Sequence, residues 1–124
     1  MDADPRHTLG ATGERLAAEH LARLGYVIVE RNYRTRWGEL DIVARCGATL
    51  AFCEVKTRRA GGRAGGALEA IAAGKQARVR RMAASWLSAR RKRPYAESIR
   101  FDAIGITVDA TGRLVSLDHL EGVF

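Results

Sequence analysis

The sequence predicts an α/β fold in which a mixed central β-sheet is flanked by helices. Two stretches carry apolar residues at helical spacing, and four runs are rich in β-branched and apolar residues. Their order along the chain, α-β-β-β-α-β, is typical of a small sheet with helices packed against it. With 124 residues, 47% of them hydrophobic, the chain is long enough for one core. We therefore expect a single domain over residues 10–124 after a flexible N-terminus, residues 1–9.

The first half of the chain is predicted to contain one helix and three strands. The helix begins at Thr12 and ends at Gly25, because its apolar residues recur at helical spacing and the glycine stops it. Those apolar residues are Ala17, Leu21 and Leu24. Three β-rich runs follow, at residues 26–30, 39–44 and 48–57. The short RCG segment between the last two predicts a hairpin.

The second half begins with a basic, glycine-rich loop, RRAGGRAGG, at residues 58–66. A long helix is predicted from Ala67 to Arg91, before Pro94, which cannot continue it. Its apolar stripe consists of Leu68, Ile71, Val79, Met82, Trp86 and Leu87. A strand is expected at residues 98–108, and residues 113–120 form a last short strand or an extended tail.

The net charge points to a polyanionic partner. Lysine and arginine number 21 against 14 aspartates and glutamates, a formal charge of +7. Nucleic acid is favoured over anionic lipid because neither terminus carries a basic amphipathic anchor. The alternative is a solvated, arginine-rich surface without a ligand.

The sequence also bounds where the protein works. It has no apolar run of membrane-span length and no signal-peptide core, so we expect a cytoplasmic protein that does not enter the membrane. Cys46 and Cys53 are its only cysteines. Their spacing fits neither a CxxC pair nor a zinc knuckle, which favours reduced structural thiols.

One constellation of charged residues suggests phosphodiester chemistry. Glu54 and Lys56 share one face of the third strand, opposite Val55, and Asp41 lies on the second strand. If the two strands pair as a hairpin, the carboxylates of Asp41 and Glu54 can approach each other. Two carboxylates with water form an oxygen-rich site suited to Mg²⁺, to which the Val55 carbonyl could add a ligand. Leu40 and Ile42 are expected on the face opposite Asp41.

Lys56 would complete such a site. Its ammonium group can orient or deprotonate a metal-bound water, or stabilise charge that builds on a phosphate. Hydrolysis of a phosphodiester needs a metal, an activated water and charge neutralisation, which these three residues can supply. The alternative is an ordinary cross-strand salt bridge between Lys56 and one of the carboxylates.

Glu14, Lys75 and Gln76 are further candidates on the helices. Glu14 is expected in the first turn of the first helix, on its core-facing side, from which it could reach the metal. Alternatively it interacts with the helix dipole. Lys75 lies inside the apolar stripe of the second helix, where it either extends past the core to solvent or, with Gln76, contacts the scissile phosphate or a water.

Four segments together resemble a known family. They are GERLAAEHLARLGYVIVERNYRTRWGELDIVA, FCEVKTRRA, GKQARVRRMAASWL and IRFDAI. The resemblance is to the YraN-like family of bacterial proteins, which is grouped with the PD-(D/E)XK, or restriction-endonuclease-like, nucleases. The pattern is similar to that of archaeal Holliday junction resolvases. It covers nearly the whole chain, from Gly10 to the closing HLEGVF, and implies a restriction-endonuclease-like core.

The resemblance also implies roles for single residues. Asp41 and Glu54 match the metal carboxylates of the superfamily, and Lys56 matches its catalytic lysine. Glu14 matches the acidic residue of the first helix, as a third metal ligand, and Lys75 with Gln76 match polar positions of the second helix. Glu39 belongs to the family motif too, as a further ligand or a partner for Arg36 or Lys56. The superfamily's proline before the aspartate is Leu40 here, as in its aspartate-only variants.

The expected function is that of a metal-dependent endonuclease. Mg²⁺, or Mn²⁺ in its place, would be the cofactor, and DNA, including branched or structured DNA, the substrate. Rival hypotheses are a non-catalytic nucleic-acid- or protein-binding module with the same fold, and a ribonuclease; a homodimer stays open. Trp37 is expected either to stack on an unpaired base or to pack half-buried. The candidate phosphate contacts are Arg58, Arg59, Arg63, Arg78 and Arg81.

Overall fold

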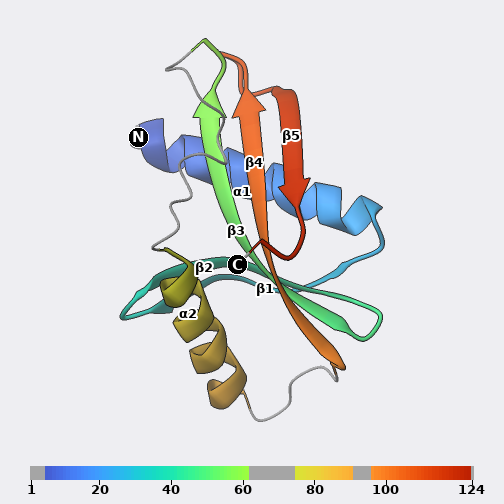
Figure 1. Ribbon diagram of the computed structural model, residues 1–124. Coiled ribbons are helices and arrows are strands. Elements are labelled where there is room, and N and C mark those ends of the chain that lie inside the picture. The colour runs from blue at the N-terminus through green and yellow to red at the C-terminus, as the bar shows by residue number, and fades with distance from the viewer. Residues whose placement is uncertain (1–4, 62–74, 91–95, 124) are drawn as a thin grey trace.

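Five strands form one mixed sheet with a helix on each face (Figure 1). The computed structural model describes residues 5–61, 75–90 and 96–123. The elements in order are α1 (Pro5–Arg23), β1 (Val27–Thr35), β2 (Gly38–Cys46), β3 (Thr49–Arg59), α2 (Lys75–Ala89), β4 (Ser98–Val108) and β5 (Leu114–Leu120). This α-β-β-β-α-β-β order confirms the predicted fold class, consistent with a restriction-endonuclease-like core.

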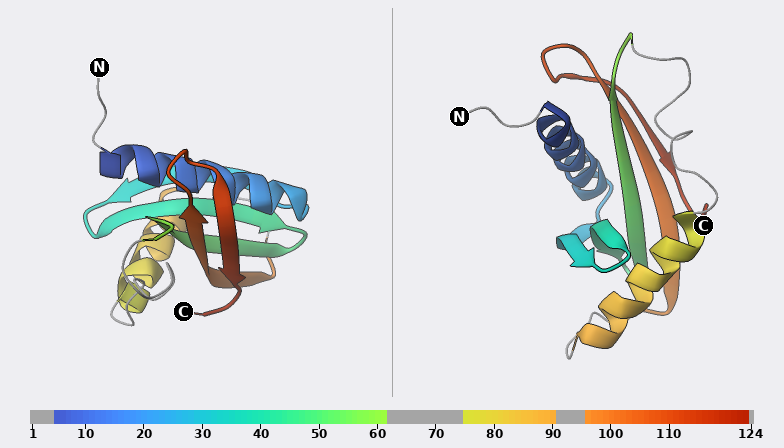
Figure 2. Two further views of the ribbon diagram at one scale, coloured as in Figure 1. Left: turned by 90° about the horizontal axis from the view of Figure 1, so that it is seen from above. Right: turned by 90° about the vertical axis from the view of Figure 1, so that its left-hand side faces the viewer.

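The strands lie in the order β1-β2-β3-β4-β5. Every neighbouring pair is antiparallel except β3 and β4, which run parallel. A parallel pair cannot be joined by a tight turn, and the connection here contains α2. Figure 2 shows that the β1–β2 hairpin lies between α1 and α2.

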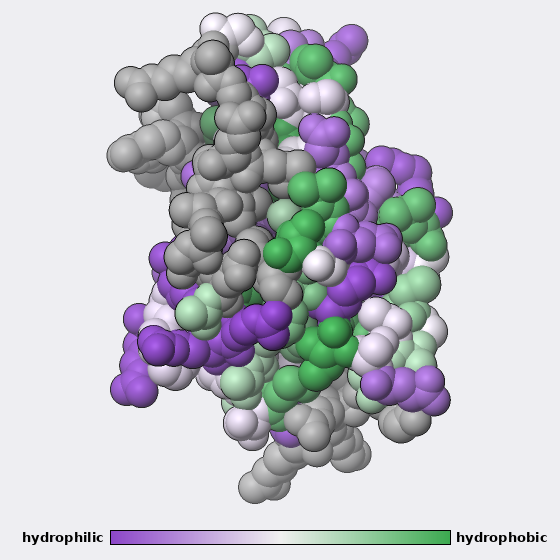
Figure 3. Space-filling model, viewed as in Figure 1, coloured by the Kyte–Doolittle hydropathy of each residue, from purple (hydrophilic) through white to green (hydrophobic). Residues whose placement is uncertain are grey.

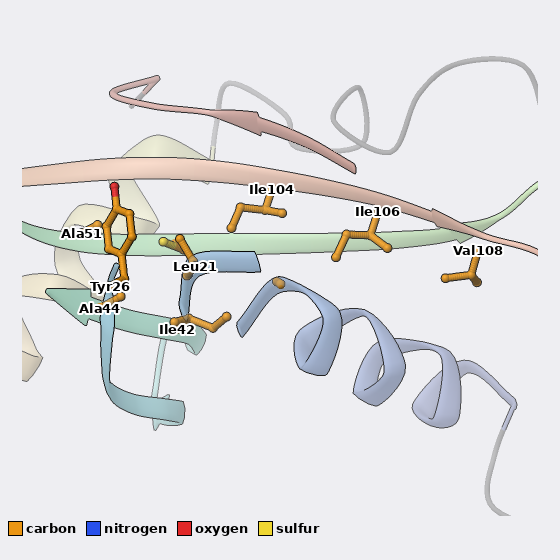
Figure 4. Close-up of a cluster of buried hydrophobic side chains, with 10 residues drawn as sticks. Leu21, Tyr26, Ile42, Ala44, Ala51, Ile104, Ile106 and Val108 are labelled. Carbon is orange, nitrogen blue, oxygen red and sulfur yellow. The ribbon is translucent and has the colours of Figure 1, made fainter. Parts of the chain in front are cut away.

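Two hydrophobic clusters, one on each face, hold the helices to the sheet. On the α1 face, Ala17 and Leu21 of the helix pack among strand residues that include Ile42, Cys53 and Ile104 (Figure 4). On the α2 face, Val79, Met82 and Trp86 pack against Leu40, Val43, Leu50 and Phe52. The alternation of side chains along β3 explains both sets, since Cys53 faces α1 and Phe52 faces α2.

A buried polar network ties β5 and the end of α1 to β4. Asp102 on β4 is fully buried and accepts two hydrogen bonds from Arg100, at 2.8 Å each, and one from the main-chain nitrogen of Gly122 at 3.1 Å. His119 Nε2 lies 2.8 Å from Asp102 Oδ2, and His119 Nδ1 lies 3.1 Å from His20 Nε2 on α1. Burial alone would raise the pKa of Asp102, but these hydrogen bonds lower it to about 2.

The first helix differs from its prediction. It begins at Pro5 rather than Thr12, so residues 5–9 are helical instead of part of a loose N-terminus. Proline is well suited to a helix start because its fixed φ is helical and its missing N–H would have no partner there. Leu24, predicted in the apolar stripe, lies beyond the helix end and is 52% exposed.

A glycine inside α1 sets its distance from the sheet. A Cβ atom at Gly13 would lie 1.6 Å from Thr57 Oγ1 on β3, so only glycine fits this contact. Gly10, one turn earlier, has nothing within 4 Å of the same position. Gly13 therefore lets α1 approach β3 closely, and the next residue along the helix is Glu14.

The remaining elements follow the predictions with shifted ends. The strand at residues 98–108 is confirmed, and the strands predicted at 26–30, 39–44 and 48–57 are longer than expected. Arg58 and Arg59 end β3 instead of beginning a loop. Residues 62–74 and Pro94, which include most of the predicted loop and the start of the long helix, lie outside the described residues. Within the described residues, neither helix has the length and apolar character needed to span a membrane.

Candidate functional site

Asp41 lies at the point where β2 and β3 separate. The ladder between these strands runs from the Cys46–Thr49 pair to the Ile42–Cys53 pair. One step further, Asp41 Oδ2 accepts a hydrogen bond of 2.7 Å from the main-chain nitrogen of Val55. The carboxylate thus takes the place of a main-chain acceptor, and it sits beside the Glu54-Val55-Lys56 segment.

The side chains around Asp41 do not alternate as predicted. Leu40 packs in the cluster beneath α2, whereas Ile42 packs in the cluster beneath α1. The prediction that both lie on the face opposite Asp41 was therefore wrong. The irregularity lies between the two residues: Ile42 and Leu40 pair with Arg31 and Tyr33 of β1, but Asp41 has no partner in this ladder, because Asn32 opposite it has a left-handed φ of 56°. Strict alternation of side chains is interrupted at such a position.

Two further carboxylates join Asp41. One oxygen from each of Glu14, Glu39 and Asp41 lies within 4.8 Å of the other two. Glu14 was predicted in the first turn of its helix, but it lies in the middle of α1, so interaction with the helix dipole does not explain it. Glu39 pairs with Arg34, at 3.4 Å, rather than with Arg36 or Lys56.

Asn32 on β1 completes the group, and sequence analysis missed it. Its φ of 56° is left-handed, a conformation that asparagine tolerates better than most residues. With its amide nitrogen assigned to the side facing the carboxylates, it donates to Glu14 Oε2 at 2.7 Å and to Glu39 Oε1 at 3.1 Å. Asn32 lies beyond the strand predicted at residues 26–30, so no sequence signal marked it.

The cluster has an excess of negative charge. Burial and the nearby charge of Glu54 raise the pKa of Asp41 to about 8, although the Val55 hydrogen bond opposes the shift. Burial and the charge of Glu39 also raise the pKa of Glu14, which hydrogen-bonds Asp41. At neutral pH the group therefore favours a bound proton or a bound cation. Oxygen donors at this spacing suit a hard divalent ion such as Mg²⁺.

Glu54 and Lys56 lie on β3 on either side of Val55, whose main-chain nitrogen binds Asp41. Glu54 is half-buried and close enough for its charge to raise the pKa of Asp41. Lys56 is exposed, and it has no ion-pair partner among the residues that the structure describes. The cross-strand salt bridge considered for Lys56 is thus not formed within the described part of the chain.

The other predicted site residues lie around α2 and the end of β3. Lys75 and Gln76 begin α2, but their side chains, like all of Arg63, lie outside what the structure describes. Arg58 is half-buried and Arg59 exposed at the end of β3. Two arginines belong to α2: Arg78, whose Cδ is 3.8 Å from a Cβ placed at Gly38, and the exposed Arg81.

Comparison with known proteins identifies relatives along nearly the whole chain. The model of the uncharacterised protein family UPF0102 matches residues 13–106. A UPF0102 protein of Frankia casuarinae is 47% identical over 120 residues, which cover 96% of this chain and 98% of the relative. A UPF0102 protein of Mycolicibacterium smegmatis is 45% identical over 99% of this chain and 98% of its own length.

A UPF0102 protein of Corynebacterium efficiens is likewise 45% identical, over 95% of this chain and 93% of the relative. The matched region includes Glu14, Asp41, Glu54 and Lys56. The resemblance noted from the sequence is therefore confirmed at the level of the family, and this chain belongs to the uncharacterised protein family UPF0102.

Proposed function

We propose that this protein is a metal-dependent nuclease that hydrolyses phosphodiester bonds in DNA. The observation that carries the proposal is the position of Asp41, half-buried among carboxylates and anchored by the Val55 N–H, beside the Glu54-Val55-Lys56 segment. A purely structural cluster would be expected to balance these charges with buried cations. This one holds three carboxylates within 4.8 Å of one another, and among the described residues the only ion pair to them is that of Glu39 with the exposed Arg34.

The donor set fits Mg²⁺ or Mn²⁺. Glu14, Glu39 and Asp41 offer oxygens within 4.8 Å of one another, and Glu54 adds negative charge nearby. A divalent cation held there would polarise a phosphate oxygen and lower the pKa of a water at the site. It would also relieve the mutual repulsion that raises the pKa of Asp41.

The protein's own groups would position the reactants. The Val55 N–H holds Asp41, and the Asn32 amide holds Glu14 and Glu39, so the carboxylates are oriented before a ligand arrives. Lys56, exposed and without an ion-pair partner among the described residues, can donate hydrogen bonds to a phosphate oxygen or orient the attacking water. Such a contact contributes where negative charge increases in the transition state.

The charge distribution supports a nucleic acid as the polyanion. The chain carries a net +7, and the α2 sequence contains basic residues but no acidic one. Contacts from Arg59 and Arg81 to phosphates would position the backbone without reading sequence. Each neutralised phosphate releases close to one counterion, so affinity should fall steeply with salt, with a log–log slope of about −0.9 per contact.

A cleavage panel tests this function. Duplex, single-stranded, flap and four-way-junction DNA, and the matching RNAs, are incubated with Mg²⁺, Mn²⁺ or EDTA. We expect divalent-dependent cleavage of DNA. Cleavage of RNA alone would assign a ribonuclease instead, and binding without cleavage of any substrate would support the non-catalytic module.

Variants show whether the cleavage belongs to this site. Asp41→Asn and Lys56→Ala should each reduce the rate, Lys56→Ala by roughly 10²–10³, while oligonucleotide binding persists. Asp118→Asn, at an exposed acid on β5 far along the chain from the cluster, is the matched control and should retain the wild-type rate. Equal rates for wild type and Asp41→Asn would refute the proposal, since cleavage would then come from elsewhere.

A further inference from the structure

A groove lies between α2 and the turn that joins β1 to β2. It is a shallow groove, widely open to solvent, with a volume of about 530 Å³. Its lining residues are Trp37, Arg81, Ala84, Ser85, Ser88 and Ala89. The α2 side chains in this set, Arg81 apart, are small, so Trp37 is the largest apolar residue of the groove. Trp37 is half-buried, because one part of its side chain packs against the hydrophobic cluster on the α2 face.

The turn that carries Trp37 is well fixed. Thr35 Oγ1 accepts a hydrogen bond from Trp37 N at 3.0 Å and donates one to the Gly38 carbonyl at 3.0 Å. The hydroxyls of Tyr33 on β1 and Ser85 on α2 lie 3.1 Å apart and join the hairpin to the helix. The aromatic surface is thus held in position without a ligand, which lowers the cost of ordering it on binding.

The charge of the groove is positive. The guanidinium of Arg36 lies over the Trp37 ring, 4.7 Å from its centre, and Arg81 lines the groove from α2. None of the described lining residues is acidic. Figure 3 shows hydrophilic side chains gathered over the β1–β2 hairpin and α2 on this face. Within the described part of the chain, the side chains of Arg81 and Ser88 have no hydrogen-bond partner.

We propose that this groove binds an unpaired nucleobase of a single-stranded segment of the substrate. The base stacks on the indole of Trp37, and Arg81 contacts the adjacent phosphate. An aromatic face together with two guanidinium groups matches a ligand that is planar and anionic, as a nucleotide is. This inference rests on the proposed function, because it adds a second contact for the same substrate.

The groove lies close to the acidic cluster along the chain. Trp37 and Asp41 belong to the same β1–β2 hairpin and are four positions apart, about 13 Å along an extended strand. A strand of several nucleotides that passes around the hairpin, from the α2 side to the α1 side, would contact both places. The groove would favour junctions, flaps and single strands over intact duplex, because bases inside a duplex are stacked on each other and cannot enter it.

Intrinsic fluorescence tests the stacking directly. The chain has two tryptophans; Trp86 is fully buried and donates to Glu30, so quenching by an added oligonucleotide reports on Trp37. The probes are oligothymidylate and an abasic deoxyribose-phosphate oligomer of equal length, which has the same charge but no bases. We expect both to bind in EDTA and only oligothymidylate to quench the fluorescence. Equal quenching by both would overturn the inference.

Two substitutions separate stacking from packing. Trp37→Leu keeps an apolar side chain without an aromatic face, and it should weaken oligothymidylate binding by about tenfold while leaving the abasic oligomer unaffected. Trp37→Phe should restore most of the lost affinity. An equal loss for both probes in Trp37→Leu would show that the residue only supports the fold, which overturns the inference.

The outcomes also separate the groove from the nuclease. Wild-type protein that binds neither probe at low salt lacks the nucleic-acid interface altogether, and both proposals then fail. Wild-type protein that binds both probes equally, with no dependence on Trp37, refutes the groove alone. Divalent-dependent cleavage that depends on Asp41 would in that case still support the nuclease.

Discussion

Asp41 is half-buried and Asp102 fully buried, and the groups that surround the two carboxylates carry opposite charges. Asp102 receives hydrogen bonds from Arg100, a main-chain nitrogen and the His119 ring, and its pKa falls to about 2. Asp41 receives one main-chain hydrogen bond and otherwise meets carboxylates, and its pKa rises to about 8. The first group is electrostatically complete. The second needs a proton or a cation from outside.

This difference separates a structural carboxylate from a candidate ligand. Buried charge that is fully paired inside the protein has little capacity to bind anything else. Like charges held close together store unfavourable energy, which a bound cation releases. Helix α1 reaches both carboxylates: Glu14 lies beside Asp41, and His20 contacts His119, which binds Asp102. The position of α1 on the sheet therefore affects both groups.

The largest loss of stability should follow Asp102→Ala. Its free energy of unfolding should fall by about 3–5 kcal/mol, because Arg100 and His119 lose their shared partner inside the protein. Urea denaturation measures this. Asp118→Ala, on the exposed side of β5, is the matched control and should change stability by less than about 0.5 kcal/mol. Equal midpoints for the two variants would show that the Asp102 network contributes no stability.

A smaller but sharper effect should distinguish two glycines of α1. Gly13→Ala should destabilise by about 1–3 kcal/mol, since its Cβ would lie 1.6 Å from Thr57 Oγ1 and push α1, with Glu14, away from β3. Gly10→Ala has open space and should stabilise by roughly 0.5–1 kcal/mol. Thermal unfolding of both proteins checks the pair, and effects of the same sign would contradict the close contact.

The contributions of Asp41 and Asp102 to the free energy of unfolding should change with pH in opposite directions. Because the folded-state pKa of Asp41 lies above its unfolded value, its contribution to stability is present below about pH 4 and is lost as pH rises through about 8. Asp102 has a lowered pKa, so its contribution is present above about pH 4 and is lost as pH falls through about 2.

Asp41→Asn isolates the first of these contributions. In EDTA at pH 9 the variant should be more stable than the wild type, by on the order of 1–2 kcal/mol, because the amide cannot be repelled by Glu54. Adding Mg²⁺ should raise the melting temperature of the wild type and leave the variant nearly unchanged. A wild type whose melting temperature ignores Mg²⁺ at pH 9 would contradict a metal centre at Asp41.

The smallest effect on stability is expected at Lys56. It is exposed and has no ion-pair partner among the described residues, so Lys56→Ala should change the free energy of unfolding by less than about 0.5 kcal/mol. Activity should fall nonetheless. A variant that unfolds much more easily than the wild type would assign Lys56 to the fold instead of the chemistry.

Local patterns were sufficient to predict much of the architecture. The strand at residues 98–108 is a continuous β-rich run, so its first and last residues could be predicted from the sequence, and the structure confirms them. The proximity of Asp41 to the Glu54 strand end followed from a short hairpin connection, which fixes the register. Their roles as metal ligands, and that of Lys56 in catalysis, stay predictions.

What the sequence did not predict depends on contacts between distant segments. Asn32 is recognisable only once β1, β2 and α1 meet around it, because an isolated asparagine in a strand carries no partner information. The same is true of His119, which was read as part of a short strand or tail and lies against Asp102. The Pro5 start of α1 was missed because Gly10, which lies before the predicted start at Thr12, argues against a helix.

The parallel pairing of β3 with β4 has a consequence for the order of folding. Each paired residue in this ladder meets a partner about fifty positions away along the chain, whereas β1, β2 and β3 are joined by short turns. Because closing long loops is slow, we expect the three-stranded meander to form first and β4 to dock late. During synthesis, the segment with Asp41, Glu54 and Lys56 would leave the ribosome well before β4. Until β4 arrives, the nascent chain would expose the open edge of β3, which makes this interval its most aggregation-prone stage.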